Sequence, residues 1–177
     1  MKFSTPLFAL GFALSVTASP LEVRDIAAFK TVIASIQTDT DALDTAIKAF
    51  TSDGAAVQAG SDKLVGTINA GVTTINAQPV LSDLDALGLT TPVNTLNDHV
   101  TTVVDDSIAK KDAFATACLG PAVLADLEAQ LAASKALATA VTAKVSDLLK
   151  PTAAQLAGKI SANIQRGVDA FTGVAGC

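Results

Sequence analysis

The residues of this chain whose types allow catalysis are few and poorly spaced for it. Histidine occurs once, at His99, so a Ser-His-Asp triad would have to use that residue as its base. The sequence contains no Gly-x-Ser-x-Gly motif, which marks the nucleophile of many hydrolases. Asp105 and Asp106 are adjacent, so on a helix they point about 100° apart and cannot face each other as a carboxylate pair. We therefore expect no catalytic residue and no enzymatic activity.

Metal ligands are equally sparse. A zinc site uses several His or Cys side chains at short spacing, but this chain has one His and two Cys, and it lacks HExxH and CxxC motifs. We expect neither a metal site nor a cofactor.

The N-terminus has the pattern of a secretory signal peptide. Met1 and Lys2 precede an apolar run from Phe3 to Val16, which ends on small residues. That run is too short to cross a bilayer, and no later stretch reaches the roughly 20 apolar residues that a transmembrane helix needs. We expect residues 1–18 to be a signal peptide and residues 19–177 to form a single secreted domain without a membrane anchor. Whether the segment Ser19 to Arg24 is retained is left open.

Cys118 and Cys177 are the two cysteines of the chain. In an oxidising compartment, a disulfide is favoured over two free thiols. The expected helix lengths bring the two residues to the same end of a bundle, so we expect them to form a disulfide.

Hydrophobic spacing predicts helices along most of the chain. In the stretch from Asp25 to Phe50, residues at alternating intervals of three and four form one stripe: Ile26, Phe29, Ile33, Ile36, Thr40, Leu43, Ile47 and Phe50. Further long helices are expected at about 55–77, 92–119, 121–149 and 152–172, with a short helical turn at 81–87. A β-strand at HVTTVV is the alternative within 92–119, because that segment is rich in β-branched residues.

These helices cannot be stable alone, because each has an apolar face that needs a partner. Short connections favour antiparallel neighbours, so we expect an all-α, up-and-down bundle of about five long helices with one short connecting turn. Two polar residues, Thr40 and Ser134, interrupt otherwise apolar stripes near their middles. Such hydroxyls either bond to a carbonyl of their own helix or meet a ligand head group.

The charge distribution excludes some partners. The chain has 12 basic and 17 acidic residues, and its formal net charge is −5. With no basic stripe and no aromatic stacking platform, it is not expected to bind nucleic acid.

The chain resembles a fungal family. A signal peptide, then DIAAFKTVIASIQTDTDALDTAIKAF, then the glycine-bearing segment GSDKLVGTINAGVTTI, is similar to the hydrophobic surface-binding protein A family, which includes domains of cell-wall galactomannoproteins. The resemblance implies a helical bundle, an extracellular or loosely wall-associated location, and affinity for fatty acids or hydrophobic surfaces. It also implies that some members recruit a secreted esterase to such surfaces.

Two functional hypotheses follow. In the first, the protein carries a fatty acid or another apolar small molecule in a cavity between helices. In the second, it is a surface-active adaptor that adsorbs to hydrophobic surfaces. The alternative to both is that the apolar stripes only form the hydrophobic core and bind no ligand or surface. If a ligand binds, the candidate seam residues are Ile33, Ile36, Thr40, Leu43, Leu64, Ile68, Leu96, Val100, Leu127, Leu131, Ser134, Val141, Ile160 and Ile164.

Overall fold

The computed structural model describes residues 22–177, which form helices joined by short connections and no β-strand. The expected signal peptide lies outside the described residues. In chain order the helices are α1 (Glu22–Ala49), α2 (Ala55–Asn76), α3 (Asp83–Leu87), α4 (Thr90–Ala109), α5 (Lys111–Thr116), α6 (Gly120–Thr142) and α7 (Lys150–Phe171). The all-α prediction is confirmed, and so is the short helical turn, which is α3.

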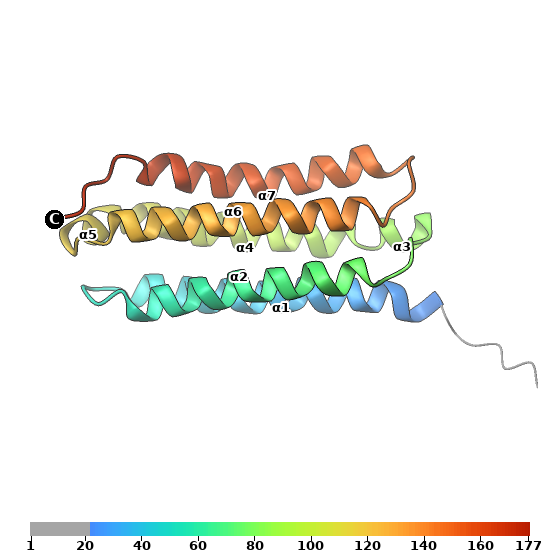
Figure 1. Cartoon of the computed structure of the whole chain (residues 1–177), viewed down its shortest axis with the longest axis horizontal. Helices are drawn as coiled ribbons and strands as arrows, with labels where there is room; N and C mark the ends of the chain where they lie inside the picture. The colour runs from blue at the N-terminus through green and yellow to red at the C-terminus, as the bar shows by residue number, and fades with distance from the viewer. Residues whose placement is uncertain (1–21) are drawn as a thin grey trace, which may run out of the picture.

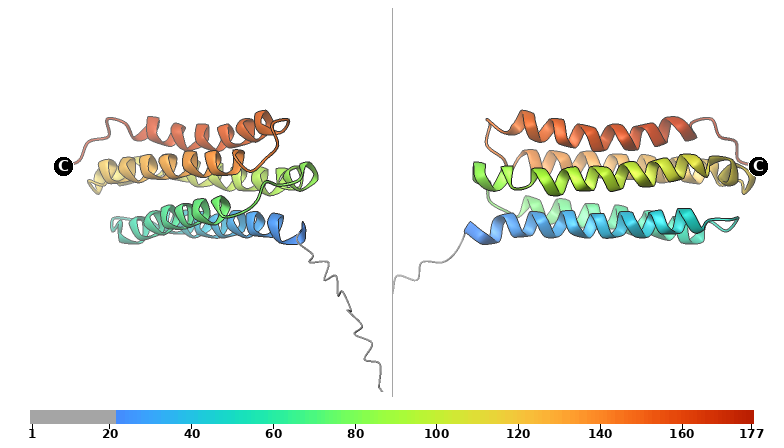
Figure 2. Two further views of the ribbon diagram at one scale, coloured as in Figure 1. Left: turned by 45° about the vertical axis from the view of Figure 1, so that its right-hand side comes forward. Right: turned by 180° about the vertical axis from the view of Figure 1, so that it is seen from behind.

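The five long helices form a closed ring. Helix α1 packs against α2 and α4, α7 packs against α6 and α4, and α2 packs against α6. Helices α1, α4 and α7 run in one direction while α2 and α6 run in the other (Figure 1, Figure 2). Successive long helices therefore alternate in direction, as an up-and-down bundle requires. However, α2 and α4 are not packed neighbours, because α3 carries the chain from one to the other across the end of the ring.

The apolar stripe of α1 is buried where this helix packs against α2 and α4. From Phe29 to Phe50 every expected stripe position is buried, and Thr40 among them is only 1% exposed. Burying such a row of side chains removes most of the apolar surface of α1 from water, and this burial is the main force that holds the ring together. The β-branched segment at 99–104 is helical as well, and its Val100, Val103 and Val104 are buried in α4.

Two expected helices end earlier than their patterns indicate. The third ends at Ala109, because Lys110 leaves helical geometry with φ −90° and ψ 4°, and the short helix α5 follows. The fourth ends at Thr142 rather than Leu149. There the Lys144 Nζ donates hydrogen bonds to the carbonyl oxygens of Asn76 and Gln78 at 2.9 and 2.6 Å, which ties the end of α6 to the end of α2.

The end of the ring that holds α5, called here the closed end, is packed by three aromatic rings. Phe114 from α5 stacks on Phe50 with ring centroids 4.2 Å apart, and it meets Phe171 edge to face at 6.0 Å. Phe114 and Phe171 are both 0% exposed. Offset and edge-to-face aromatic pairs add to the effect of burial, so this cluster stabilises the closed end beyond the burial of its apolar surface.

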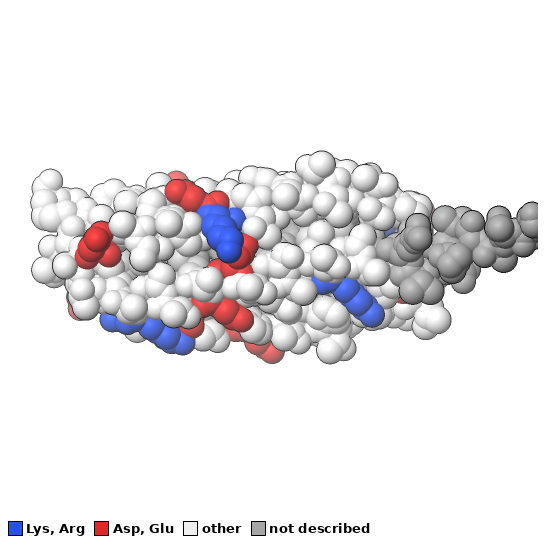
Figure 3. Space-filling model, turned by 90° about the horizontal axis from the view of Figure 1, so that it is seen from below, with Lys and Arg blue, Asp and Glu red and all other residues white. Residues whose placement is uncertain are grey.

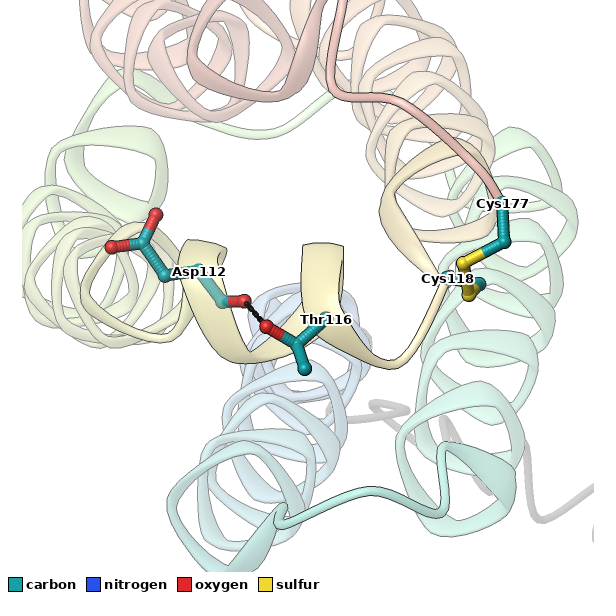
Figure 4. The surroundings of a disulfide bond; sticks show 4 residues. All are labelled: Asp112, Thr116, Cys118 and Cys177. Atoms are coloured by element: carbon teal, nitrogen blue, oxygen red, sulfur yellow. Dashed lines mark hydrogen bonds between the residues drawn. A yellow bond between two sulfur atoms is a disulfide. The ribbon is translucent and has the colours of Figure 1, made fainter.

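A disulfide fastens the C-terminal tail to the closed end. Cys118 and Cys177 are bonded, with their Cα atoms 5.2 Å apart, so the expected pairing is confirmed (Figure 4). Within α5, the Thr116 hydroxyl donates a hydrogen bond to the carbonyl oxygen of Asp112 at 2.8 Å. A side chain at Gly120 would collide with Val174 of the tail, so only glycine allows the tail to lie over the start of α6.

The surface of the ring is sparsely charged. Figure 3 shows one long face, on which a few acidic and basic side chains are interspersed in a mainly uncharged surface. Among the described residues, every helix is too short or too polar to cross a membrane.

Candidate functional site

The ring of helices encloses a cavity of about 130 Å³ along its axis. All five long helices contribute to its lining, together with α3 and the connection between α6 and α7. Each helix packs on two neighbours, and closing a ring with five helices rather than four moves every helix farther from the axis, which leaves more axial space. No charged residue is among the side chains that line it, which include Phe29, Val32, Leu89, Val93, Leu137, Val145, Leu149 and Leu156.

The cavity lies toward α3, because Ala86, Leu87 and Leu89 line it while the Phe50, Phe114 and Phe171 rings of the aromatic cluster do not. A Cβ atom at Gly167 of α7 would lie 3.1 Å from Leu127 and 3.4 Å from Val104. Glycine at this position therefore lets α7 press against α6 and α4, which leaves little space between them.

At the opposite end, called here the α3 end, the lining reaches the surface. Leu87 lines the cavity and is 52% exposed. Three other large apolar side chains at the same end are mainly exposed: Leu84 of α3 at 80%, and Val80 and Leu148 of the connections at 61% and 77%. Helix α3 buries none of its residues. An apolar cavity that continues into an exposed apolar patch is accessible to an apolar ligand from this end.

Three polar side chains face the cavity near its inner end. The Thr40 hydroxyl donates to the carbonyl oxygen of Ile36 in its own helix at 2.8 Å. Gln130 is 7% exposed, and its Nε2 donates to the Ser61 Oγ at 2.9 Å. Ser134 lies one turn after Gln130 on α6 and also lines the cavity. The polar groups at this depth are thus all uncharged.

A second, smaller void of about 20 Å³ lies beyond the inner end of the cavity. The two spaces share Val103, Val104 and Gln130 in their linings, so these residues separate them. We call these three residues the floor of the cavity. The small void is lined on its far side by residues that include Ile47, Val57 and Phe114.

The candidate residues from the sequence fall on both sides of the floor. Those that line the main cavity are Ile33, Ile36, Thr40, Leu64, Ile68, Leu96, Val100, Ser134, Val141, Ile160 and Ile164. Leu43 and Leu127 line the small void instead, and Leu131 is buried but lines neither. Leu87, Val145 and Leu149 also line the cavity but are not among the candidates from the sequence. Val145 continues the helical spacing from Ser134 and Val141, so its position in that stripe could have indicated it, whereas Leu87 and Leu149 are marked only by their apolar character.

The groups with acid–base character lie away from the cavity. His99 contacts Asp41 through Nδ1 at the surface between α4 and α1, and neither residue lines the cavity. The described part of the chain holds no group of three or more His, Cys, Asp or Glu side chains that could bind a metal ion. The site is therefore suited to binding an apolar molecule by burial.

Comparison with known proteins extends these observations. Residues 26–143 match the family described as hydrophobic surface binding protein A. The chain belongs to this family. It is 44% identical over 172 residues to cell wall mannoprotein 1 of Aspergillus fumigatus, and the match covers 97% of this chain and 60% of that protein. It is 33% identical to cell wall mannoprotein 1 of Talaromyces marneffei, and that match covers 97% of this chain and 39% of that protein. The chain thus spans about 60% or less of the length of these two relatives.

Solved structures share the fold. Ligand binding domain 1 of the Penicillium marneffei MP1 protein, complexed with arachidonic acids, aligns with a TM-score of 0.81 and 31% identity, covering 84% of this chain and 99% of that one. AFMP4P in complex with palmitic acid aligns with a TM-score of 0.79 and 27% identity, covering 83% of this chain and 99% of that one. The hydrophobic surface binding protein A fold of this chain is therefore also the fold of domains that have been solved with fatty acids.

Proposed function

We propose that this protein binds a long-chain fatty acid, or a similar apolar lipid, in its axial cavity and catalyses no reaction on it. The observation that carries the proposal is the uncharged cavity that opens at the α3 end, within a fold shared with domains solved in complex with arachidonic and palmitic acids.

The cavity volume implies that binding widens the ring. A cavity of about 150 Å³ in another protein accommodates benzene, so about 130 Å³ is too small for an entire long acyl chain. The ligand has to displace lining side chains or move helices apart. The α3 end is the place where this costs least, because α3 buries no residue and packs against no long helix over an extended contact.

Charge favours one orientation of the ligand. No Lys or Arg lines the cavity, and burying an unpaired carboxylate is very unfavourable. We therefore place the carboxylate at the α3 end, near water, and the methyl end against the floor. Lys144 lies on the connection between α6 and α7, and Lys150 is the first residue of α7. Val145 and Leu149 of the same connection line the cavity, so basic groups are close in sequence to this opening.

Burial of the acyl chain supplies the binding free energy. About ten methylenes at about 0.8 kcal/mol each give about 8 kcal/mol, before the ordering of the ligand is counted. If nothing opposed it, a free energy of this size would correspond to a dissociation constant of about 1 μM, and the ordering cost makes the net affinity weaker than that.

A titration of delipidated protein with a fluorescent fatty acid tests the proposal. We expect saturable binding near one ligand per chain, with little intrinsic fluorescence background because the chain contains no Trp or Tyr. Ser134→Phe fills part of the cavity and should weaken binding strongly. Ala136→Phe on the exposed face of α6 is the matched control and should bind normally. Absence of saturable binding to the unmodified chain would refute the proposal.

The location follows from the relatives. Because they are named as cell wall mannoproteins, we propose that this chain is secreted and is found in the medium or loosely associated with the cell wall.

A second candidate function is adsorption to hydrophobic surfaces, with recruitment of a secreted esterase as its further consequence. The exposed Val80, Leu84 and Leu148 at the α3 end favour adsorption through that end. Replacing Leu84 and Leu148 by Ser should then reduce adsorption to a hydrophobic solid. If adsorption is strong in the unmodified chain while fatty-acid binding is absent, this second function replaces the first.

A further inference from the structure

We infer that Gln130, held by Ser61, sets the length of acyl chain that the cavity accepts. This inference rests on the proposed function, since it concerns where the methyl end of the bound chain stops. It assigns to the floor of the cavity a role in ligand selection.

Gln130 is placed to act as a barrier. It lies on α6 and lines both the main cavity and the small void, together with Val103 and Val104 of α4. Its amide crosses from α6 to α2, where Nε2 donates to the Ser61 Oγ at 2.9 Å. Ser61 lines only the small void, so the hydrogen bond spans the boundary between the two spaces.

The hydrogen bond makes this barrier difficult to displace. Gln130 is 7% exposed and Ser61 is 2% exposed, so neither side chain has ready access to water. An acyl chain that pushed the amide aside would leave a buried amide and a buried hydroxyl without partners, which is unfavourable. An apolar side chain in the same place could change rotamer without that penalty.

Beyond the floor there is apolar surface that a longer chain would otherwise reach. The small void is bordered by the apolar Leu43, Ile47 and Leu127, with the Phe114 ring at its far side, and its lining also includes the polar side chains of Ser61, Ser107 and Asp126. Removing the Gln130 side chain joins the main cavity to this void. The combined space extends the cavity along the ring axis toward the closed end.

The consequence is a limit on chain length. Each additional methylene that enters the cavity should strengthen binding about fourfold, which corresponds to about 0.8 kcal/mol per buried methylene. Once the methyl end reaches Gln130, further methylenes remain at the α3 end near water. Affinity should then stop rising with chain length.

The experiment measures dissociation constants for saturated fatty acids of graded length. For the unmodified chain we expect affinity to rise and then reach a plateau. In Gln130→Ala the plateau should move to longer chains. Gln130→Leu keeps most of the side-chain volume but loses the hydrogen bond to Ser61, so it should move the plateau in the same direction but by less. An unchanged plateau in Gln130→Ala overturns the inference.

Two further outcomes are informative. If Gln130→Leu weakens binding equally for every chain length, the amide contacts the head group, and the inference is wrong although the protein still binds fatty acids. If the unmodified chain binds no fatty acid of any length, the proposed function itself fails.

Folding controls keep the test valid. Thermal unfolding should show that each variant is folded at the temperature of the assay. Val104→Ala opens the floor from a different helix, and it should also move the plateau to longer chains if Gln130→Ala proves unstable. Leu131→Ala removes a buried side chain that lines neither space, so it should lower stability without moving the plateau.

Discussion

The Thr67 hydroxyl of α2 donates a 2.6 Å hydrogen bond to Asp39 Oδ2 of α1. The Lys63 Nζ contacts the other carboxylate oxygen at 2.8 Å, and Asp39 is only 6% exposed. Burial alone would raise the pKa of Asp39, but the hydrogen bonds from Lys63 and Thr67 and the charge of Lys63 outweigh it, so the pKa lies below its ordinary value.

Removing this carboxylate should destabilise the protein in a pH-dependent way. Asp39→Ala should lower the free energy of unfolding near neutral pH by about 1.5 to 3 kcal/mol, the usual range for hydrogen bonds to a charged group. Because the folded-state pKa is lowered, this stabilisation is complete above the unfolded-state pKa of about 3.9 and is lost as the pH falls through the folded-state value. Urea unfolding near neutral pH and at about pH 3 should show the difference narrowing in acid. Asp98→Ala, an exposed residue of α4, is the control and should change stability by less than about 0.5 kcal/mol.

Removing the charge of Asp126 should stabilise the protein, in contrast to the loss expected for Asp39. Burial raises its pKa most, and the nearby Asp62 adds to the effect, while the hydrogen bond that Gln58 Nε2 donates at 2.9 Å opposes it. The fold thus favours the protonated carboxyl, and this contribution is lost as the pH rises from the unfolded-state pKa through the folded-state value. Asp126→Asn should therefore stabilise the protein near neutral pH and have little effect at about pH 3. A variant that is less stable than the unmodified chain near neutral pH would contradict this prediction.

The aromatic cluster should be a large single contributor to stability. Phe114→Ala removes a ring that is 0% exposed and contacts both Phe50 and Phe171, so it should lower the free energy of unfolding by about 3 to 5 kcal/mol. Leu148→Ala removes a side chain that is 77% exposed and should have an effect of less than about 0.5 kcal/mol. Chemical denaturation of the two variants side by side is the measurement. Similar losses of unfolding free energy in both variants would show that the aromatic cluster contributes no more to stability than an exposed leucine.

The disulfide should stabilise the closed end. It joins residues 59 positions apart, and in the chain-entropy model a loop of that length contributes about 4 kcal/mol. Replacing both cysteines by Ser should therefore lower the unfolding temperature clearly. Thiol titration of the unfolded, unreduced chain should detect no free thiol, and two reactive thiols would contradict the pairing.

Thr40 should prove dispensable to both fold and binding. Its hydroxyl already donates to the Ile36 carbonyl oxygen, so Thr40→Val removes a local hydrogen bond and keeps a side chain of similar shape. We expect a stability change within about 1 kcal/mol and an unchanged affinity for fatty acid. A strong loss of affinity with an intact fold would place the ligand head group beside Thr40 and away from the α3 end.

The apolar stripe of α1 is predictable from the sequence because it depends on local spacing. A row of apolar residues at intervals of three and four needs only helical geometry to lie on one face, and the positions from Phe29 to Phe50 are all buried. The pairing of Cys118 with Cys177 is predictable for a related reason, because the chain contains only two cysteines and helix lengths bring them to one end. That His99 is the only histidine also follows from composition alone.

The position of the open space within the core depends on the tertiary structure. Ile36 and Leu43 belong to the same stripe of α1, yet Ile36 lines the main cavity and Leu43 lines the small void. Periodicity tells which face of a helix is covered, whereas the distance between two helices depends on residues from both, such as Gly167 against Leu127 and Val104. The end of α4 at Lys110 also depends on the tertiary structure. The apolar pattern continues past it, but α5 turns there to place Phe114 between Phe50 and Phe171, which are distant in sequence and meet only in the folded ring.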